Sequence, residues 1–364
     1  MSTLLVSGIY PPQIGGPATY IPQLAARLAS KGKRVTVLTL LNSPDSEEIF
    51  PTWKVVKLRN SFKPLRAVNL ILKIISFLKS HDQVFANGLL EETGIALFLA
   101  KRTGIAKIVG DPVWERAINQ KKTQRSLSDF NQSRLNFKQS LQRKLLVFSL
   151  NQFQIVVTPS AELAKLIIKW GISENKVQII PNGVTCQKDS NTNRDIDVLT
   201  VSRLVTWKNV DLVIKAVASK GLSLTVIGDG PAQKELTELS SKLGADIKFL
   251  GELAKHDVEQ YMKRAKLFVL YSTYEGQSFA LLEAMSFGVV PVVSSCEGNL
   301  FIRHNYDGVV VKESDYQELG SKLLKTLDNH KELIQLRENG RQRINEDFCL
   351  TVLLDKVIAT LETL

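Results

Sequence analysis

Two glutamates eight residues apart are the clearest candidates for chemistry in this sequence. Glu275 stands before a glycine, and Glu283 lies in an otherwise apolar run, ALLEAM, that has the pattern of a helix. A carboxylate among apolar side chains is costly unless it is hydrogen-bonded. Its oxygens can accept bonds from two hydroxyl groups, so a sugar and a ribose are natural partners. The plainer interpretation is one capping glutamate and one exposed glutamate.

Two cations, Arg203 and Lys208, lie in the segment SRLVTWK, directly after a predicted strand. A guanidinium offers a planar fork of donors and an ammonium offers a point charge. Both suit a diphosphate that gains negative charge as it leaves. The alternative is a pair of solvated surface cations.

Paired glycines, Gly15 and Gly16, follow the first predicted strand and open a predicted helix. Glycine lets a ligand approach the backbone closely, and a helix N-terminus presents free N–H groups to an anion. The pair is not a GxGxxG fingerprint, which argues against a dinucleotide-dependent dehydrogenase. An ordinary strand-to-helix turn would look the same.

The elements that must position these residues alternate between short β-branched runs and longer amphipathic segments. We expect strands near 4–8, 35–40, 54–58, 83–86, 107–110 and 155–160, and helices near 17–32, 64–79, 90–102 and roughly 129–150. After the polar segment 187–197, a predicted linker, the alternation begins again. The sequence therefore predicts an α/β protein with two Rossmann-like, doubly wound domains, 1–186 and 187–349, and a ligand site in the cleft between them.

Composition is that of a globular protein: 44% of the 364 residues are apolar and 23% are charged. No apolar run is long enough for a membrane span, and the first residues read as a strand and not as a signal peptide. The three cysteines, Cys186, Cys296 and Cys349, form no CxxC pair. This pattern predicts neither a disulfide framework nor a metal site and fits the cytoplasm.

Positive charge is concentrated in the first half of the chain. Residues 1–190 hold 26 Lys and Arg against 12 Asp and Glu, whereas residues 191–364 hold 21 against 24. Residues 64–79 form a predicted helix with a polar stripe (Arg66, Asn69, Lys73, Ser76), and residues 116–144 hold eight basic side chains and one acid. An anionic membrane surface is one candidate partner. Simple packing on a sheet explains a wide apolar face equally well. Nucleic acid is disfavoured because no nucleic-acid-binding motif accompanies the charge.

Six segments, taken in order, resemble the large GT4 family of retaining glycosyltransferases, which have the GT-B fold. They are GGPATY at 15–20, IIPNGV at 179–184, SRLVTWKN at 202–209, VIGDGP at 226–231, LGELA at 250–254 and the E-x7-E element at 275–283. The resemblance covers nearly the whole chain.

The resemblance implies a role for each matching residue. Gly15 and Gly16 would approach the donor diphosphate, and Arg203 and Lys208 would hold it. Glu275 would bind hydroxyls of the transferred sugar, and Glu283 would bind those of the ribose. The backbone of Gln277, Ser278 and Phe279 would meet sugar and phosphate, and Leu253 would lie near the base.

The sequence departs from the family pattern at two places. Gln277 and Ser278 replace the usual aromatic–glycine pair, which affects the sugar contacts. Asp111 stands where many members carry a histidine, and we expect it to act as a catalytic or sugar-contacting carboxylate. Its structural alternative is an Asx turn before Pro112.

The resemblance implies transfer of a sugar from a nucleotide sugar, with a UDP- or GDP-sugar expected, to a saccharide or lipid-linked acceptor in cell-surface polysaccharide or glycolipid synthesis. No metal or other cofactor is expected, since cations and helix N-termini neutralise the diphosphate. Front-side displacement is favoured over a double displacement through Asp111. The expected location is cytoplasmic, peripheral on the inner face of the membrane. A terminal helix, 350–364, would pack back on the first domain.

Two alternatives stay open. A nucleotide-sugar epimerase would share the fold but would need further acid–base residues, and the four histidines lie in no recognisable motif. A non-catalytic nucleotide-sugar-binding homologue would be expected to lose Glu275 or Lys208, and both are present.

Overall fold

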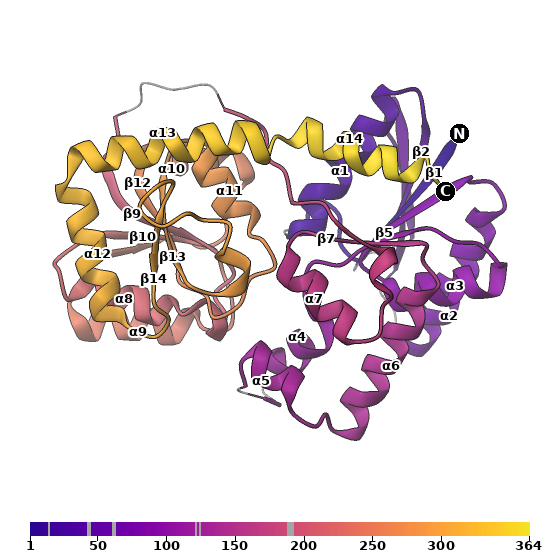
Figure 1. Cartoon of the computed structure of the whole chain (residues 1–364), viewed down its shortest axis with the longest axis horizontal. Coiled ribbons are helices and arrows are strands. Elements are labelled where there is room, and N and C mark those ends of the chain that lie inside the picture. The colour runs from indigo at the N-terminus through magenta and orange to yellow at the C-terminus, as the bar shows by residue number, and fades with distance from the viewer. Residues whose placement is uncertain (14, 42–44, 60–62, 121, 124, 188–192) are drawn as a thin grey trace. The chain divides into compact units, whose positions relative to one another are not determined.

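The computed structural model describes residues 1–364 except 14, 42–44, 60–62, 121, 124 and 188–192. The chain divides into two compact units. Unit 1 consists of Met1–Pro181 and Thr351–Leu364, and unit 2 of Asn182–Leu350. Part of the predicted linker, residues 188–192, lies outside the described residues. Each unit is a sheet covered by helices (Figure 1).

The sheet of unit 1 has the strand order β3-β4-β2-β1-β5-β6-β7-β8. Its strands are β1 (Ser2–Ser7), β2 (Arg34–Leu41), β3 (Ser46–Ile49), β4 (Trp53–Arg59), β5 (Gln83–Asn87), β6 (Ile105–Lys107), β7 (Ile155–Thr158) and β8 (Val177–Ile179). All neighbours pair in parallel except β3, which runs antiparallel to β4. Leu4, Leu5 and Val6 of β1 are fully buried, as expected for a parallel sheet covered on both faces.

The helices of unit 1 are α1 (Gly16–Ser30), α2 (Lys63–Leu78), α3 (Leu90–Ala100), α4 (Pro112–Asn119), α5 (Leu127–Gln132), α6 (Phe137–Asn151) and α7 (Ala161–Lys169). The helix expected at 129–150 is therefore two helices. The break has a local cause, because Asn136 starts α6 with a capping box to Gln139. The strand expected at 107–110 ends at Lys107, because the next residues lead into Asp111, the N-cap of α4.

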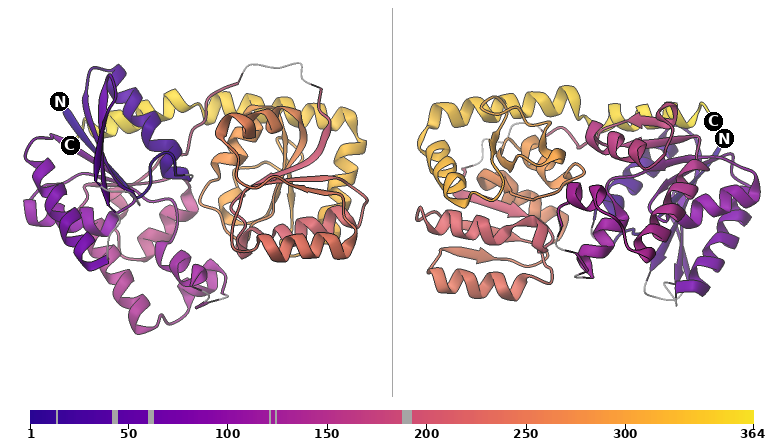
Figure 2. Two further views of the ribbon diagram at one scale, coloured as in Figure 1. Left: turned by 180° about the vertical axis from the view of Figure 1, so that it is seen from behind. Right: turned by 60° about the horizontal axis from the view of Figure 1, so that its bottom comes forward.

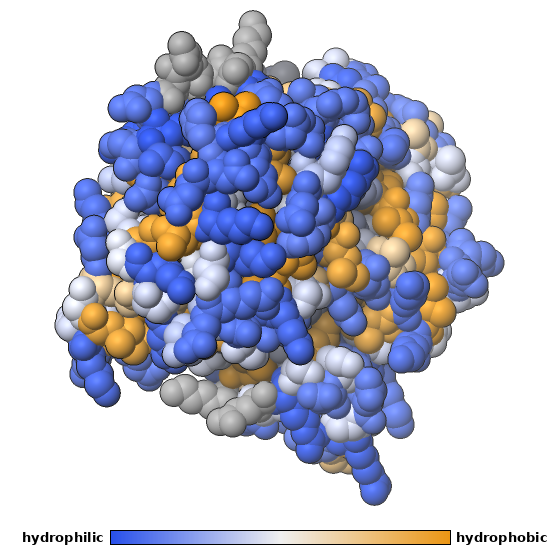
Figure 3. All heavy atoms as spheres, turned by 60° about the vertical axis from the view of Figure 1, so that its left-hand side comes forward, coloured by the Kyte–Doolittle hydropathy of each residue, from blue (hydrophilic) through white to orange (hydrophobic). Residues whose placement is uncertain are grey.

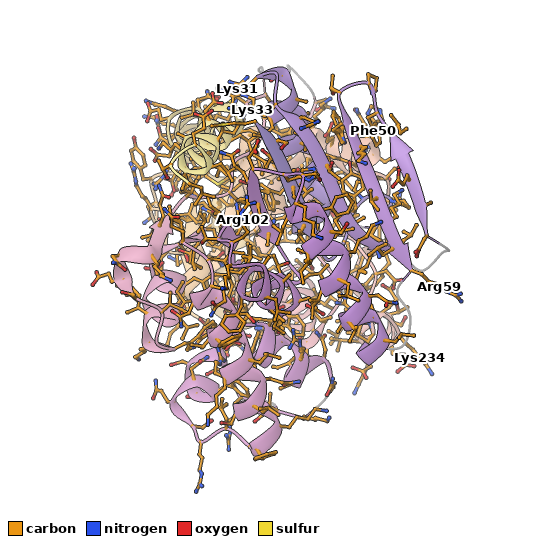
Figure 4. All side chains as sticks on the ribbon, turned by 90° about the vertical axis from the view of Figure 1, so that its right-hand side faces the viewer. Lys31, Lys33, Phe50, Arg59, Arg102 and Lys234 are labelled. Carbon is orange, nitrogen blue, oxygen red and sulfur yellow. The ribbon has the colours of Figure 1, made fainter. Side chains whose placement is uncertain are left out.

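The last helix, α14 (Leu350–Leu361), lies almost wholly in unit 1. Its Asp355 pairs with Arg27 at 2.5 Å and Lys31 at 3.1 Å, and Glu362 pairs with Lys33 at 2.9 Å. Figure 4 shows Lys31 and Lys33 beside this helix. Buried leucines face inward, so α14 completes the core of unit 1.

The sheet of unit 2 has the order β11-β10-β9-β12-β13-β14, and all its strands are parallel. They are β9 (Ile196–Val201), β10 (Leu224–Ile227), β11 (Ile247–Phe249), β12 (Ala265–Leu270), β13 (Val290–Ser294) and β14 (Val309–Val311). The chain runs outward from β9 through β10 and β11, then returns to β12 on the other side of β9. The point where strand order reverses lies between β9 and β12, which is where such sheets bind ligands.

Helices cover both faces of this second sheet (Figure 2). They are α8 (Val210–Ala218), α9 (Gln233–Leu243), α10 (Lys255–Arg264), α11 (Phe279–Ser286), α12 (Tyr316–Asp328) and α13 (His330–Asp347). Two buried apolar clusters fill the space between sheet and helices. The surface seen in Figure 3 is mainly polar, with apolar side chains in small groups. Within the described residues, we find no helix with the length and apolar character to cross a bilayer.

Candidate functional site

Lys208 and Glu275 meet where the strand order of unit 2 reverses. Lys208 closes the turn after β9, and Glu275 follows β12. The Lys208 Nζ lies 2.5 Å from the Glu275 Oε1, and the Ser272 hydroxyl donates to the same oxygen at 2.5 Å. Both side chains are largely buried, with 16% of Lys208 and 8% of Glu275 exposed. Two neighbouring strands therefore bring a cation and a carboxylate to one edge of the sheet.

Only one carboxylate oxygen of Glu275 is used. Among the described residues, the hydrogen bonds to this side chain all end on Oε1. Gly298 supports the backbone from behind, because a Cβ there would lie 2.0 Å from the Glu275 carbonyl oxygen. The second oxygen therefore has no hydrogen-bond donor among the residues that the structure describes, and it is the candidate acceptor for a ligand hydroxyl group.

Cys296, near Glu275, is not a candidate nucleophile. Burial, with a further contribution from the charge of Glu275, raises the pKa of this thiol to about 12. A thiol with such a pKa stays protonated at neutral pH and is a poor nucleophile.

Helix α11 points its N-terminus at the same edge of the sheet. Ser278 caps it, accepting from the Leu281 N–H at 3.3 Å. The N–H groups of a first helical turn have no partner within the helix and favour an anion. Lys208 and the start of α11 therefore both place positive charge near Glu275.

Gln277 turns away from this edge. Its side-chain Oε1 accepts from the Asn182 N–H at 2.5 Å, and its carbonyl accepts from the Asn182 amide at 2.9 Å. Both residues are buried. Gln277 therefore anchors Asn182 of the segment IIPNGV, and its side-chain Oε1 is already in use. Asn182 belongs to the segment IIPNGV at 179–184, for which the sequence predicts no individual role.

Arg203 is exposed on a loop that is tied to its neighbours. The Leu204 N–H donates to the Asp229 carbonyl at 2.9 Å, and the Gly228 N–H donates to the Gly251 carbonyl at 2.7 Å. A Cβ at Gly228 would lie 1.9 Å from the Ser202 carbonyl oxygen. The loops after β9, β10 and β11 therefore pack against one another as one layer. Arg203 is exposed on this layer, and Leu253 is partly buried against the apolar core.

Glu283 lies one turn from the end of α11, as the sequence predicted. Its carboxylate is 3.4 Å from the Lys255 Nζ at the start of α10. Burial raises the pKa of Glu283, and the charge of Lys255 opposes that shift. The residue is 22% exposed and so can still meet a ligand. The sequence does not predict the role of Lys255, because its positive charge is the only feature that could link it to Glu283.

Asp111 is fully buried and its hydrogen-bonding capacity is in use. The Oδ1 atom accepts from the Val113 and Trp114 N–H groups at 3.0 and 3.2 Å. The Oδ2 atom accepts from Arg143 at 2.5 Å and from the Asn131 amide at 3.1 Å. This is the Asx-type cap that was the structural alternative, extended by a buried ion pair. The geometry favours a positioning role for Asp111.

Gly15 and Gly16 open α1 in unit 1. Gly15 has a φ of 151°, and a Cβ there would lie 2.7 Å from the Ile9 Cδ1, so this position favours glycine. Gly16 is the first residue of the helix. Their N–H groups lie at a helix N-terminus, where an anion would be favoured. Within the described part of the chain, no group of three His, Cys, Asp or Glu side chains could hold a metal ion.

These features define a class of protein: a doubly wound α/β chain whose second sheet presents cations, a helix N-terminus and two carboxylates at its switch point. Two family models match it. One is described as "Glycosyltransferase Family 4" and covers residues 14–188, and the other is described as "Glycosyl transferases group 1" and covers residues 186–343. The chain belongs to this family of glycosyltransferases, which have the GT-B fold.

Known proteins are similar to this chain over different lengths. It is 24% identical to mannosylfructose-phosphate synthase of Agrobacterium fabrum, over 96% of this chain and 86% of that protein. It is 26% identical to an Escherichia coli enzyme named UDP-Gal:alpha-D-GlcNAc-diphosphoundecaprenol alpha-1,3-galactosyltransferase, over 50% of this chain and 49% of that one.

Solved structures share the fold at low identity. HepE of Anabaena, solved with UDP and glucose, superposes with a TM-score of 0.80 at 20% identity, covering 100% of both chains. Sucrose-phosphate synthase of Thermosynechococcus elongatus gives 0.83 at 17% identity, covering 100% of this chain and 98% of that one.

Proposed function

We propose that this protein transfers a sugar from a nucleotide-sugar donor to a saccharide or lipid-linked saccharide acceptor, with retention of the anomeric configuration. The observation that carries the proposal is the Lys208–Glu275 pair at the switch point of unit 2, beside the N-terminus of α11. Of the relatives named above, one is a synthase of a sugar phosphate and the other is named for a diphosphoundecaprenol-linked saccharide. HepE was solved with UDP. A UDP-sugar is therefore the first donor to test, and a GDP-sugar the second.

The donor diphosphate would lie between cations and a helix N-terminus. Arg203 is exposed and would bind one side of the diphosphate, and Lys208 would share its ammonium between Glu275 and a phosphate oxygen. The backbone of Ser278 and Phe279 would add N–H donors. Charge that develops on the leaving diphosphate is then stabilised without a metal ion.

The sugar and the nucleoside would be bound by carboxylates and loops. Glu275 would accept a sugar hydroxyl on its second oxygen, and Glu283 would accept ribose hydroxyls while Lys255 holds it in place. Leu253 would lie against the base. We expect Gly15 and Gly16, at the start of α1, to contribute to phosphate binding, and unit 1 to bind the acceptor.

We favour a front-side displacement. The acceptor hydroxyl attacks the anomeric carbon on the face that the diphosphate leaves, and a phosphate oxygen of the leaving group takes the hydroxyl proton. Asp111 does not serve as the nucleophile in this proposal, because all its hydrogen-bonding positions are occupied within unit 1. A lipid-linked acceptor would require the protein to work at the cytoplasmic surface of a membrane.

Nucleotide release from a panel of UDP-, GDP- and ADP-sugars tests the proposal. We expect release from one donor, with acceptor, to fall about 10²- to 10³-fold in Lys208→Ala, the usual cost of losing one group that stabilises a leaving charge. Glu275→Ala should fall similarly. The control is Lys266→Ala, which breaks a half-exposed pair with Asp197 elsewhere in unit 2.

Three other outcomes would change the assignment. Conversion of the donor sugar without an acceptor would indicate an epimerase. Tight donor binding with no turnover would indicate a binding protein. Neither turnover nor a donor-induced rise in Tm would refute the proposal.

A further inference from the structure

Two neighbouring helices of unit 1 expose large apolar side chains on one flank. Helix α3 packs against α6, and the two lie side by side in Figure 1. The exposed residues are Phe98 and Leu99 on α3 and Phe137, Leu141, Leu145 and Phe148 on α6. We name these six residues the α3–α6 strip. Contiguous exposed apolar surface usually marks an interaction site.

The α6 part of the strip follows one side of the helix. Its members are spaced by four, four and three residues, which places them above one another on a helical surface. Phe137 is 86% exposed and Leu141 is 59% exposed. On the other side Leu146 and Leu150 are fully buried. The capping box at Asn136 fixes the first turn, so these side chains are presented on an ordered helix.

The α3 part continues the same surface. The rings of Phe98 and Phe148 pack edge to face with their centroids 5.5 Å apart. Phe98 is still 55% exposed and Leu99 is 59% exposed, although their own helix is otherwise packed. The strip therefore spans two helices and is not a set of isolated surface residues.

The charge beside the strip has one sign. Helix α6 carries Lys138, Arg143 and Lys144 and has no Asp or Glu. Lys138 and Lys144 are exposed, and so is Lys101 directly after α3. The two acids of α3 are already paired, Glu91 with Arg116 at 2.7 Å and Glu92 with Arg66 at 3.6 Å. An anionic partner would complement the charge of this flank.

We propose that the α3–α6 strip docks this protein onto an anionic lipid bilayer. The apolar side chains would enter the boundary between headgroups and acyl chains, and Lys101, Lys138 and Lys144 would meet lipid phosphates. A second copy of the chain would bring the same lysines against one another. Half of the strip is leucine, which suits acyl chains and offers no ring on which the bases of a nucleic acid could stack.

This docking goes beyond the proposed function and rests on it in one respect. If the acceptor is lipid-linked, docking would bring unit 1 to the surface that holds the acceptor. Binding to vesicles that contain no acceptor depends on the strip alone. The two proposals can therefore fail separately.

Vesicle co-sedimentation of the full chain tests the docking. The probes are vesicles of phosphatidylcholine with phosphatidylglycerol and vesicles of phosphatidylcholine alone. We expect binding to the anionic vesicles only, weakened by salt. Lys138→Gln/Lys144→Gln should weaken it about fivefold for each lysine removed, the usual contribution of one such charge near an anionic surface. Phe137→Ser/Leu141→Ser should weaken it by at least about tenfold, because both side chains would lose their apolar contact.

Matched controls come from unit 2. Ile334→Ser on α13 and Lys234→Gln on α9 also change exposed residues and should leave vesicle binding unchanged. The affected positions are on the surface, so the Tm of every variant should stay near that of the parent. Turnover of a water-soluble acceptor should also be unchanged in the strip variants.

The proposal is overturned if the parent protein does not bind anionic vesicles, or if it binds them equally well after both double substitutions. A dimer that dissociates in Phe137→Ser/Leu141→Ser, without vesicle binding, would assign the strip to a second copy. Loss of oligonucleotide binding in the same variant, again without vesicle binding, would assign it to nucleic acid.

Discussion

The ion pair between Lys208 and Glu275 affects both halves of the proposed donor. The ammonium group would bind the diphosphate and the carboxylate would bind the sugar, but in the free protein the two groups bind each other. In Glu275→Gln the Ser272 hydrogen bond can persist while the negative charge is lost. We expect UDP alone to bind at least as tightly, because Lys208 is released and the repulsion of the diphosphate is removed. Turnover should fall about 10²-fold or more, because the bond to the sugar weakens in the transition state. Calorimetry with UDP beside a turnover assay measures both, and equal loss of the two would contradict this account.

Asp111 offers a second test at the level of single residues. In Asp111→Asn the cap can remain, but Arg143 is left as a buried charge without its partner. Breaking a buried pair costs about 3–5 kcal/mol. We expect urea unfolding to show a loss of that order and Arg143→Met to show a similar one. The double variant Asp111→Asn/Arg143→Met should lose much less than the sum.

The same double variant separates position from catalysis. If Asp111 only positions α4 and α5, turnover should recover together with stability in the double variant. If a carboxylate at 111 takes part in the reaction, the double variant should fold and remain inactive.

Sequence alone could single out Glu275, Lys208 and Arg203 as candidates, because the chemistry proposed for them follows from residue type and from their place after predicted strands. It could not show that Gln277 faces inward. Its partner Asn182 is 95 residues away along the chain, and a contact of that kind depends on the folded sheet. Ser272 was likewise missed, because a serine in a loop carries no pattern that links it to a glutamate.

At the scale of elements, Gly228 allows the loop after β10 to pack closely against the loop after β9. Gly228 has a φ of +127° and its missing Cβ would overlap the Ser202 carbonyl. Gly228→Ala should push the loop after β10 off the loop that carries Arg203. We expect a loss of stability above about 3 kcal/mol, since strain and overpacking add, together with weaker donor binding.

Gly244→Ala is the matched control for that variant. Gly244 also has a positive φ, +59°, but a Cβ there meets no atom within 4 Å. Its cost should be about 1 kcal/mol, the left-handed backbone penalty alone. Equal effects of the two substitutions, measured by urea unfolding, would show that the close approach to Ser202 is unimportant.

Most elements were predictable because apolar periodicity differs between buried strands and amphipathic helices. The errors have local causes. The helix expected at 129–150 is interrupted because Asn136 begins a new helix, a cap that looks like any other asparagine in a polar stretch. On α2 the predicted polar stripe includes half-buried Arg66 and Lys73, while Leu65 and Leu72 are 60% exposed, because neighbouring helices decide which side faces water.

For the molecule as a whole, pH should change the stability through one buried lysine. Lys107 at the end of β6 is 1% exposed, and its Nζ lies 3.8 Å from the centre of the Tyr20 ring. Within the described residues this Nζ has no hydrogen-bond partner. Burial lowers the pKa of Lys107 to about 7. An unfolded lysine has a pKa of about 10.4.

Between these two pKa values the unfolded chain binds a proton that the folded protein has released. The free energy of unfolding should therefore rise with pH above about 7, by up to about 1.4 kcal/mol per pH unit. Below about pH 7 both states are protonated, and the cost of burial is at its full value. Lys107→Met should be more stable than the parent at pH 7 and should lack this rise. Urea unfolding at several pH values measures this dependence. Parallel curves of unfolding free energy against pH for the parent and Lys107→Met would contradict the prediction.

Helix α14 should matter to unit 1 and not to unit 2. Leu354 is 3% exposed within unit 1, whereas Val352 on the same helix is 51% exposed. Leu354→Ala should cost about 2–5 kcal/mol, and Val352→Ala should cost less than about 0.5 kcal/mol. Calorimetry that resolves two transitions should show only the unit 1 transition shifted by Leu354→Ala. A shift of both would mean that the units unfold together.

Because α14 follows unit 2 along the chain, the ribosome makes the two units in an interleaved order. Residues up to 181 emerge first but lack the helix that covers Arg27, Lys31 and Gln83, and that helix is translated only after all of unit 2. Domains usually fold during synthesis in the order in which they emerge. Here the first unit to begin is the last to be completed. A chain truncated anywhere within unit 2 therefore leaves apolar core residues of unit 1 uncovered, and chaperones and proteases can recognise them.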